Sequence, residues 1–240
     1  MTANPAHLLN PIFVALNTTD PDYARQLAER VRGAVGGLKL GLEFFNAHGP
    51  DGVRPFLEMG LPVFLDLNYH DIPNTVAGAA RAAAALGVSI LNVHAQGGAA
   101  MMRAAADAVK SVSPSTQLIA VTMLTSLSDE DLPSVGLTPP VSDQVLRLAS
   151  LTQQCGLDGV VCSAHEIARL RSELGPDFLL VVPGIRPAGS DVGDQKRVMG
   201  ATEAIAAGAS RLVIGRPITG AADPAKAARD IAQSLGIPAA

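Results

Sequence analysis

Short runs of apolar and β-branched residues alternate along this chain with longer, alanine-rich stretches. The apolar runs lie at 12–16, 37–41, 62–67, 89–95, 117–124, 159–163, 178–184 and 211–217. Short apolar runs that are bounded by Gly, Pro, Asn or Asp are typical of strands buried on both faces. The pattern therefore predicts eight β-strands.

The stretches between these runs place apolar residues three and four positions apart, which is the spacing of a helix that buries one face. Such stretches lie at 21–31, 76–87, 98–109 and 141–154. A last helix is predicted at 223–235, where Asp223 can cap the first turn and Pro224 occupies the first helical position. Four glycines follow predicted helices, where a left-handed stop is favoured: Gly87, Gly156, Gly175 and Gly208.

Strands that alternate with helices form a parallel sheet, and eight of them can close into a (β/α)8 barrel. The chain has 240 residues, about the usual length of one such barrel, and no linker-like segment divides it. We predict a single α/β domain over residues 1–240, a (β/α)8 TIM barrel.

The composition indicates how the core is built and in which compartment the protein is expected. Hydrophobic residues make up 48% of the chain but aromatic residues only 3%, so the core must consist of Ala, Val, Leu and Ile. The sequence lacks an apolar run of the roughly 18 residues needed to span a bilayer, and its N-terminus does not resemble a signal peptide. We expect a cytoplasmic protein without a membrane partner. Cys155 and Cys162 lack metal-ligand spacing and are expected to serve as small apolar residues.

The net charge and its distribution indicate which kinds of partner the protein is expected to bind. The net charge is −4 and the basic residues are scattered, which disfavours binding to nucleic acid. A phosphate-bearing small molecule needs only one or two well-placed arginines. In barrels, the loops after strands seven and eight commonly bind phosphate. Here 183-PGIRP-187 and 214-IGRP-217 each place a glycine beside an arginine, Arg186 or Arg216, and together they favour a phosphate site over a surface ion pair with a turn glycine.

A charged cluster is predicted at the ends of strands two and three. Lys39 and Asp66 come from neighbouring strands, so a buried ion pair is one interpretation. Asp71 adds a second carboxylate, and surplus negative charge in a low-dielectric site favours a chemical role instead. His70 and His94 lack the three-ligand pattern of a metal site, and we expect His94 to be a hydrogen-bonded histidine at the barrel rim.

Six segments carry a resemblance to a known family: 66-DLNYHDIPNT-75, 91-LNVHAQGG-98, 119-IAVTMLTS-126, 156-GLDGVVCSAHE-166, 183-PGIRPAGSDVGDQKR-197 and 213-VIGRPIT-219. In order and without large gaps, they resemble the bacterial orotidine 5′-phosphate decarboxylases, which convert orotidine 5′-monophosphate (OMP) to UMP and CO2 in pyrimidine biosynthesis. The resemblance implies a (β/α)8 homodimer with active sites at the subunit interface and with neither cofactor nor metal.

The resemblance also implies roles for individual residues. Lys39, Asp66 and Asp71 match an alternating charged array, in which Asp66 destabilises the substrate carboxylate, Lys39 also contacts the ribose, and Asp71 reaches into the partner's site. Thr125 matches the residue that meets the pyrimidine, and Ile72 and Thr75 match residues offered by the neighbouring subunit. The implied phosphate grip consists of Arg186, Gln195, Gly215 and Arg216.

Two positions depart from the family pattern. The array Asp-x-Lys-x-x-Asp has asparagine, Asn68, in place of its lysine, and Asn17 stands where the family usually has a ribose-binding aspartate. An amide is no useful acid near neutral pH, whereas an ammonium stabilises negative charge and donates a proton. We expect decarboxylation to be severely impaired and nucleotide binding to be largely retained.

Several alternatives remain open at this point. The substitution at position 68 is compatible with an engineered change, a non-catalytic relative that binds UMP or OMP, or a shifted chemistry in which Asp66 or Asp71 is the acid. A sugar-phosphate decarboxylase of the same superfamily shares the aspartate pattern but requires magnesium. The long loop 183–197 and Thr125 favour the nucleotide.

Overall fold

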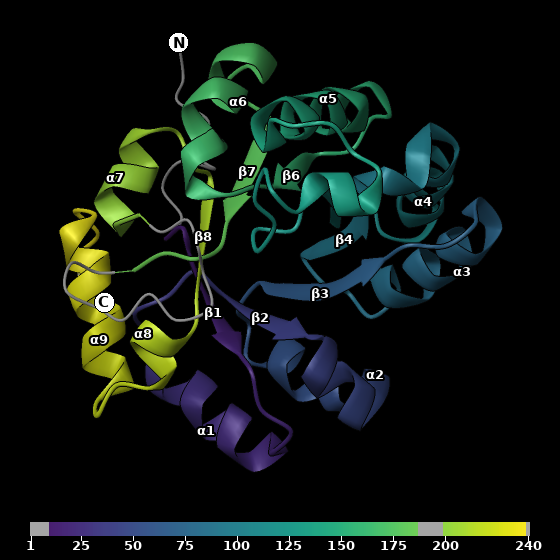
Figure 1. Ribbon diagram of the computed structural model, residues 1–240. Coiled ribbons are helices and arrows are strands. Elements are labelled where there is room, and N and C mark those ends of the chain that lie inside the picture. The colour runs from purple at the N-terminus through teal and green to yellow at the C-terminus, as the bar shows by residue number, and fades with distance from the viewer. Residues whose placement is uncertain (1–9, 187–198, 239–240) are drawn as a thin grey trace, which may run out of the picture.

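The computed structural model describes residues 10–186 and 199–238, and in it eight parallel strands close into a barrel in chain order (Figure 1). The first strand pairs with both the second and the eighth, which closes the sheet. This confirms the predicted (β/α)8 barrel. The strands are β1 (Ile12–Leu16), β2 (Gly37–Gly41), β3 (Val63–Tyr69), β4 (Ile90–His94), β5 (Gln117–Val121), β6 (Gly159–Val161), β7 (Leu179–Val182) and β8 (Arg211–Ile214).

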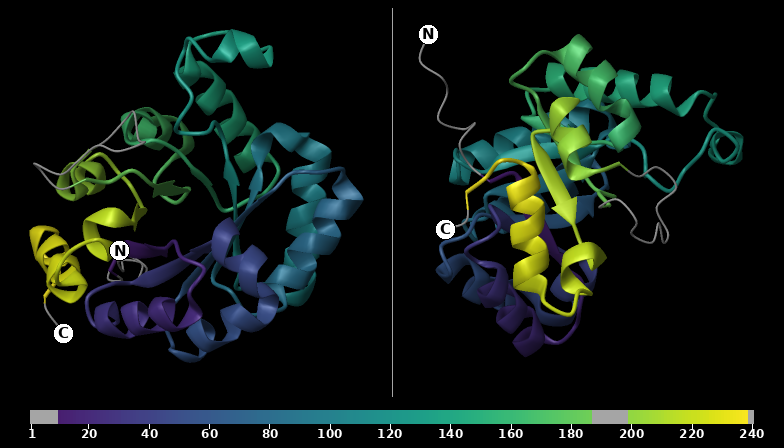
Figure 2. Two further views of the ribbon diagram at one scale, coloured as in Figure 1. Left: turned by 60° about the horizontal axis from the view of Figure 1, so that its bottom comes forward. Right: turned by 90° about the vertical axis from the view of Figure 1, so that its left-hand side faces the viewer.

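Helices surround the barrel on its outer face (Figures 1 and 2). They are α1 (Pro21–Val31), α2 (Leu42–Glu58), α3 (Pro73–Ala84), α4 (Gly98–Val112), α5 (Val141–Gln154), α6 (Ile167–Leu174), α7 (Ala201–Ala206), α8 (Arg216–Thr219) and α9 (Pro224–Ser234). The helix predicted at 76–87 begins earlier, because Pro73 is well suited to a first helical turn. None of the described helices is long and apolar enough to cross a membrane.

The local stop and start signals act as predicted. The carboxylate of Asp223 accepts a hydrogen bond from the backbone N–H of Lys226 (3.1 Å) and caps α9. All four glycines predicted to follow helices have positive φ, between 79° and 109°. The cysteines are buried, as expected for small apolar residues.

The hydrophobic core has two layers, and strand alternation assigns residues to them. On β1, Ile12, Val14 and Leu16 face the helices, whereas Phe13 and Ala15 face the barrel interior. The interior layer consists of Phe13, Ala15, Phe64, Ile90, Ile119, Val181 and Val213. The same alternation determines which side chains at the strand ends point into the barrel mouth.

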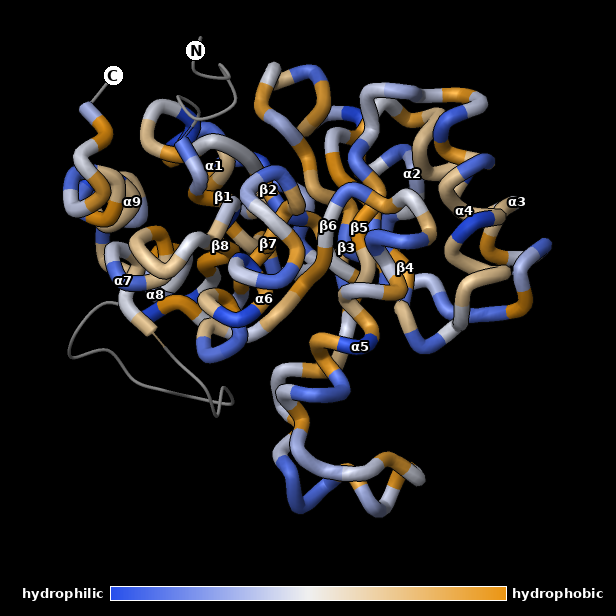
Figure 3. Tube along the Cα trace, turned by 90° about the horizontal axis from the view of Figure 1, so that it is seen from above, coloured by the Kyte–Doolittle hydropathy of each residue, from blue (hydrophilic) through white to orange (hydrophobic). Residues whose placement is uncertain are grey.

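Five predicted strands, β4 to β8, end one to three residues earlier than expected. The run predicted at 211–217 ends as β8 at Ile214, and Arg216 already belongs to α8. Beta-strand β5 ends at Val121 rather than at 124, and β7 ends at Val182 rather than at 184. The apolar residues beyond β5 leave the sheet, and Leu124 is 49% exposed. The segment that follows, residues 122–140, projects away from the barrel before α5 begins (Figures 2 and 3).

Candidate active site

Three polar side chains share the inward orientation in the middle of β2, β3 and β4. Leu38 and Leu40 face the helices, so Lys39 between them faces inward. The same reasoning places Asp66, between Leu65 and Leu67, on the inner face. Asn92 follows the inward-facing Ile90 by two residues on β4, and its side chain points the same way.

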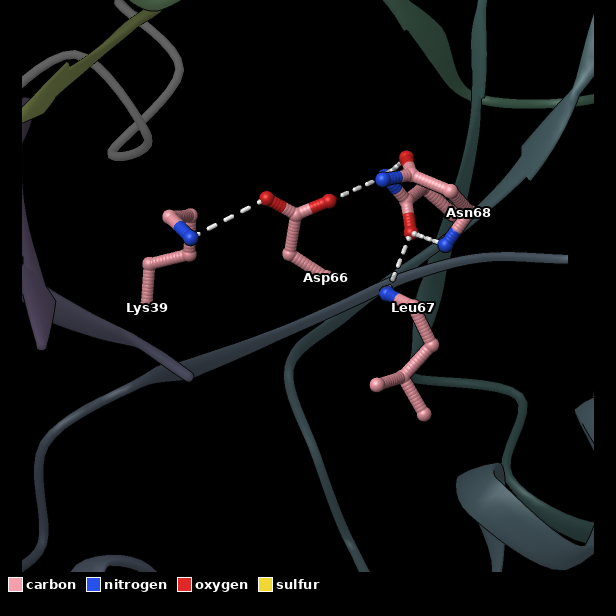
Figure 4. A network of polar contacts seen from close by, with 5 residues as sticks. Lys39, Asp66, Leu67 and Asn68 are labelled. Carbon is pink, nitrogen blue, oxygen red and sulfur yellow. Dashed lines mark hydrogen bonds and ion pairs between the residues drawn. The ribbon is translucent and has the colours of Figure 1, made fainter. Parts of the chain in front are cut away.

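Lys39 and Asp66 form an ion pair, with 3.1 Å between Nζ and Oδ2 (Figure 4). Their side chains are 12% and 22% exposed, so the pair lies largely out of water. Gly41 makes room for it, because a Cβ added at Gly41 would lie 3.0 Å from the Lys39 Nζ. The structure thus brings together the two residues that the sequence placed at the mouth, in the ion pair that was one of the two interpretations.

Asn68 lies where β3 departs from regular pairing. The register of β3 against β4 shifts between Leu65 and Tyr69, which marks a bulge. Asn68 has a φ of 52°, in the left-handed region that asparagine tolerates better than most residues. Side chain 68 therefore originates from an irregular stretch of backbone.

Asn92 connects the residues of this irregular segment through four hydrogen bonds. Its Oδ1 accepts hydrogen bonds from the backbone N–H groups of Leu67 (3.0 Å) and Asn68 (2.9 Å). Its Nδ2 donates to Asp66 Oδ1 and to Asn68 Oδ1, both at 2.7 Å. Asn92 lies in the segment 91-LNVHAQGG-98, but no role was predicted for it from the sequence. The signal in the sequence was an asparagine in the middle of the apolar run 89–95, because a buried amide needs hydrogen-bond partners.

Asp71, Ile72 and Thr75 lie in the exposed loop after β3 and in the first turn of α3. The Asp71 carboxylate accepts a hydrogen bond from the backbone N–H of Ile72 (2.6 Å). Among the described residues, Asp71 takes part in no ion pair, so one chain does not unite it with the Lys39–Asp66 pair. Ile72 is 68% exposed, which is unusual for a large apolar side chain. Their contribution to a partner's site stays a prediction.

The predicted phosphate residues follow β7 and β8, which are paired neighbours. Arg186 donates a backbone hydrogen bond to the carbonyl of Met199 (3.0 Å). Gly215 precedes the short helix α8, of which Arg216 is the first residue. A Cβ added at Gly215 would lie 4.0 Å from Asn17 Nδ2, so the end of β1 adjoins this loop.

Two further residues, Thr125 and Gln195, were also predicted to bind the substrate. Thr125 lies in a half-buried turn beyond β5. Gln195 lies outside the described residues.

The two histidines lie against each other beside the mouth. The rings of His70 and His94 are stacked with centroids 5.4 Å apart. Burial lowers the pKa of His94, the proximity of His70 lowers it further, and the carboxylate of Asp66 opposes both effects. Among the described residues, no group of three or more His, Cys, Asp or Glu side chains is placed to hold a metal ion.

The site contains the largely buried ammonium of Lys39 and the carboxylate of Asp66, which is bonded through both of its oxygens. One oxygen of Asp66 meets the Lys39 ammonium and the other meets the Asn92 amide. Such a pre-organised pair can act on charge that develops in a bound substrate. At position 68 the site presents an amide, which can donate a hydrogen bond but supplies no proton near neutral pH.

Comparison with known proteins agrees with this geometry. Residues 10–231 match the model of the orotidine 5′-phosphate decarboxylase / HUMPS family. The chain is 57% identical to the orotidine 5′-phosphate decarboxylase of Rhodospirillum rubrum, over 94% of each chain. It is 52% identical to that of Paramagnetospirillum magneticum, over 96% of this chain and all of the relative.

A crystal structure supports the same grouping. Orotidine 5′-phosphate decarboxylase from Lactobacillus acidophilus superimposes with a TM-score of 0.84 at 37% identity, over 94% of this chain and 99% of that one. The family match spans nearly the whole barrel and includes every strand that contributes to the mouth. The chain therefore belongs to the orotidine 5′-phosphate decarboxylase family.

Proposed function

We propose that the chain binds OMP at the barrel mouth and that this is a decarboxylase site, converting OMP to UMP and CO2, whose turnover is severely reduced by Asn68. The observation that carries the proposal is the inward-facing Lys39–Asp66 pair, 3.1 Å apart, on the neighbouring strands β2 and β3 in a member of this family. The other expected groups within the described residues lie in segments that follow strands of the same barrel, which supports the proposal. We also expect the protein to act in the cytoplasm.

The reaction explains why position 68 matters. The bond between C6 of the pyrimidine and the carboxylate breaks, CO2 leaves, and the electron pair stays on C6 until a proton replaces the lost group. Asp66 raises the energy of the substrate carboxylate by like-charge proximity, and Lys39 holds Asp66 and counters the growing negative charge. A lysine at position 68 would add a second cation and supply the proton.

Binding uses the opposite side of the mouth. Arg216 and Arg186 grip the phosphate together with Gln195, and Gly215 allows close backbone approach. Asn17, which adjoins Gly215, meets the ribose with an amide in place of a carboxylate. Thr125 meets the base. None of these contacts depends on residue 68, so nucleotide affinity survives the loss of turnover.

The proposed site is shared between two subunits. Asp71, Ile72 and Thr75 are exposed in one chain and lie on a single loop and helix turn, where a second copy can receive them. Dilution to monomers should therefore abolish UMP binding. Analytical ultracentrifugation with parallel UMP titration tests this, and a monomer that binds UMP fully would contradict it.

The deciding experiment follows the ultraviolet absorbance change from OMP to UMP with this chain and with Asn68→Lys at equal concentration. We expect rapid turnover only in the lysine variant, faster by a factor of about 10² or more, because one pre-organised donor is typically worth that much. If neither protein turns over, the substrate is wrong or another position is limiting. Equal, rapid turnover by the unmodified chain would refute the role given to Asn68.

A second candidate is a UMP- or OMP-binding protein without catalysis. It is favoured by the fit of Asn68, whose side chain accepts a hydrogen bond from Asn92 and whose amide suits a positive φ. Isothermal titration with UMP separates the two functions: tight binding together with an Asn68→Lys variant that remains inactive would favour the binding protein.

A further inference from the structure

Asn92 is a buried side-chain amide whose polar atoms are all hydrogen-bonded. It is fully buried on β4, and its amide makes four hydrogen bonds of 2.7–3.0 Å. A side-chain amide has two donor hydrogens and an oxygen with two lone pairs, so these four bonds use its whole capacity. A buried polar group satisfied in this way fixes the geometry of everything it contacts.

The orientation of this amide follows from its partners. The backbone N–H groups of Leu67 and Asn68 can only donate, so the atom that faces them must be the oxygen of Asn92. The nitrogen is then directed at Asp66, whose carboxylate accepts. No other residue type of this size combines two acceptor sites with two donors: aspartate lacks the donors, leucine lacks both, and serine is too short to span the four groups.

Two consequences reach the proposed chemistry. First, the bulge in β3 leaves the N–H groups of Leu67 and Asn68 outside regular strand pairing, and the Asn92 oxygen takes the place of a strand carbonyl for both. Second, Asp66 is held through Oδ1 by Asn92 and through Oδ2 by Lys39, which prevents rotation of the carboxylate. The origin of side chain 68 and the direction of Asp66 are thus set by one amide.

We propose that Asn92 is a positioning residue for this site: it acts through the bulge and through Asp66. The inference rests on the proposed decarboxylase function for its kinetic consequence, but the positioning itself is a property of the fold. A lysine at position 68 would inherit the same backbone bonds and would leave one Asn92 hydrogen free for another acceptor.

The kinetic test uses Asn92→Ala in the full-length Asn68→Lys protein, with Asn10→Ala as the matched control. Asn10 is also an amide with two structural hydrogen bonds, to the carbonyl of Ala34 (2.7 Å) and from the N–H of Ile12 (3.0 Å), but it precedes β1 at the other end of the barrel. We expect Asn92→Ala to lower kcat by about tenfold or more with KM changed by less than about threefold, because misplacement of reacting groups affects the transition state most.

The control should lose comparable thermal stability and keep kcat within about twofold. If Asn92→Ala keeps its kcat, or if Asn10→Ala loses as much, Asn92 is merely structural and the inference is wrong.

The pH dependence of kcat distinguishes a positioning role from a structural one. Asn92→Asp keeps the shape but faces Asp66 with a second carboxylate, so the acidic limb of kcat should move to higher pH, by about one unit, and an unmoved limb would contradict the inference.

A readout independent of activity separates this inference from the proposed function. In the unmodified chain, Asn92→Ser should increase the hydrogen-exchange rates of the Leu67 and Asn68 amides by about tenfold or more, while the amides of β5 and β6 remain unchanged. Asn10→Ala should leave these two amides protected. If the two amides stay protected in Asn92→Ser, the positioning role fails, even if OMP turns out to be the substrate. If their protection is lost but Asn68→Lys is inactive, only the proposed function fails.

Discussion

The backbone at Asn68 allows a sharp test, because glycine and alanine should exchange their usual order of stability there. Among the described residues, Asn68 is the only non-glycine residue with positive φ, at 52°. For an ordinary L-residue this conformation costs roughly 1–2 kcal/mol, whereas glycine adopts it freely. Both substitutions remove the hydrogen bond from Asn92, so the difference between them isolates the backbone.

We expect Asn68→Gly to exceed Asn68→Ala in free energy of unfolding by about 1 kcal/mol. Asn68→Lys should resemble alanine in backbone cost and also lose the bond to Asn92, worth about 0.5–1.5 kcal/mol. Attraction between the new ammonium and Asp66 offsets part of this loss. The lysine variant should therefore be less stable than the unmodified chain by about 1 kcal/mol while it gains activity.

Urea unfolding followed by far-ultraviolet circular dichroism is the suitable assay, since the chain contains no tryptophan. All variants need equal protein concentration, because a dimer's stability depends on it. The control is Asn46, exposed within α2, where alanine should exceed glycine by about 0.5–1 kcal/mol. If alanine is also the more stable residue at position 68, the bulge is not held at positive φ and the reasoning fails.

Three further predictions concern groups around the mouth. In the Asn68→Lys protein, Gly41→Ala should displace the Lys39 ammonium, which lies 3.0 Å from the added Cβ. This should lower kcat by about tenfold while the urea midpoint changes little, and an unchanged kcat would contradict the prediction. Asn17→Asp should tighten UMP binding by about 1 kcal/mol, roughly fivefold in Kd, because charged acceptors form stronger hydrogen bonds. Weaker binding in a calorimetric titration would contradict this prediction. Burial and His70 lower the pKa of His94 in the folded state. The contribution of neutral His94 to stability is therefore present above about pH 6.5 and is lost as pH falls through the folded pKa. His94→Gln should flatten that part of the curve of unfolding free energy against pH.

The barrel was predictable because its signals are local and repeated. Each strand is an apolar run of the right length, and helix stops such as Gly87 and Gly208 need only the sequence around them. The ends of β4 to β8 were predicted one to three residues too late, and at β5 the reason is that apolar composition continues into the loop. Leu124 looks like strand sequence but lies about half-exposed beyond the sheet. What ends a strand here is loss of a pairing partner, which a single run of residues does not encode.

The charged pair was predictable for a similar reason. Alternation on two neighbouring strands is enough to direct Lys39 and Asp66 into one mouth. The role of Asn92 was not, because it depends on the register shift in β3, a property of two strands together. The shared use of Asp71 depends on a second chain and stays a prediction.

The irregularities of this barrel gather at one place, and that is itself an argument about function. Asp66–Asn68 and the neighbouring residues of β2 and β4 include a register shift, a non-glycine residue at positive φ, a largely desolvated ion pair and a fully buried amide. Each costs stability relative to a regular apolar strand, and such departures concentrate at functional sites. Asparagine suits the left-handed backbone better than lysine does, so its presence relaxes the site. We therefore expect Asn68→Lys to lose stability as it gains turnover, while the hydrogen bonds from the backbone of residues 67 and 68 to Asn92 are retained.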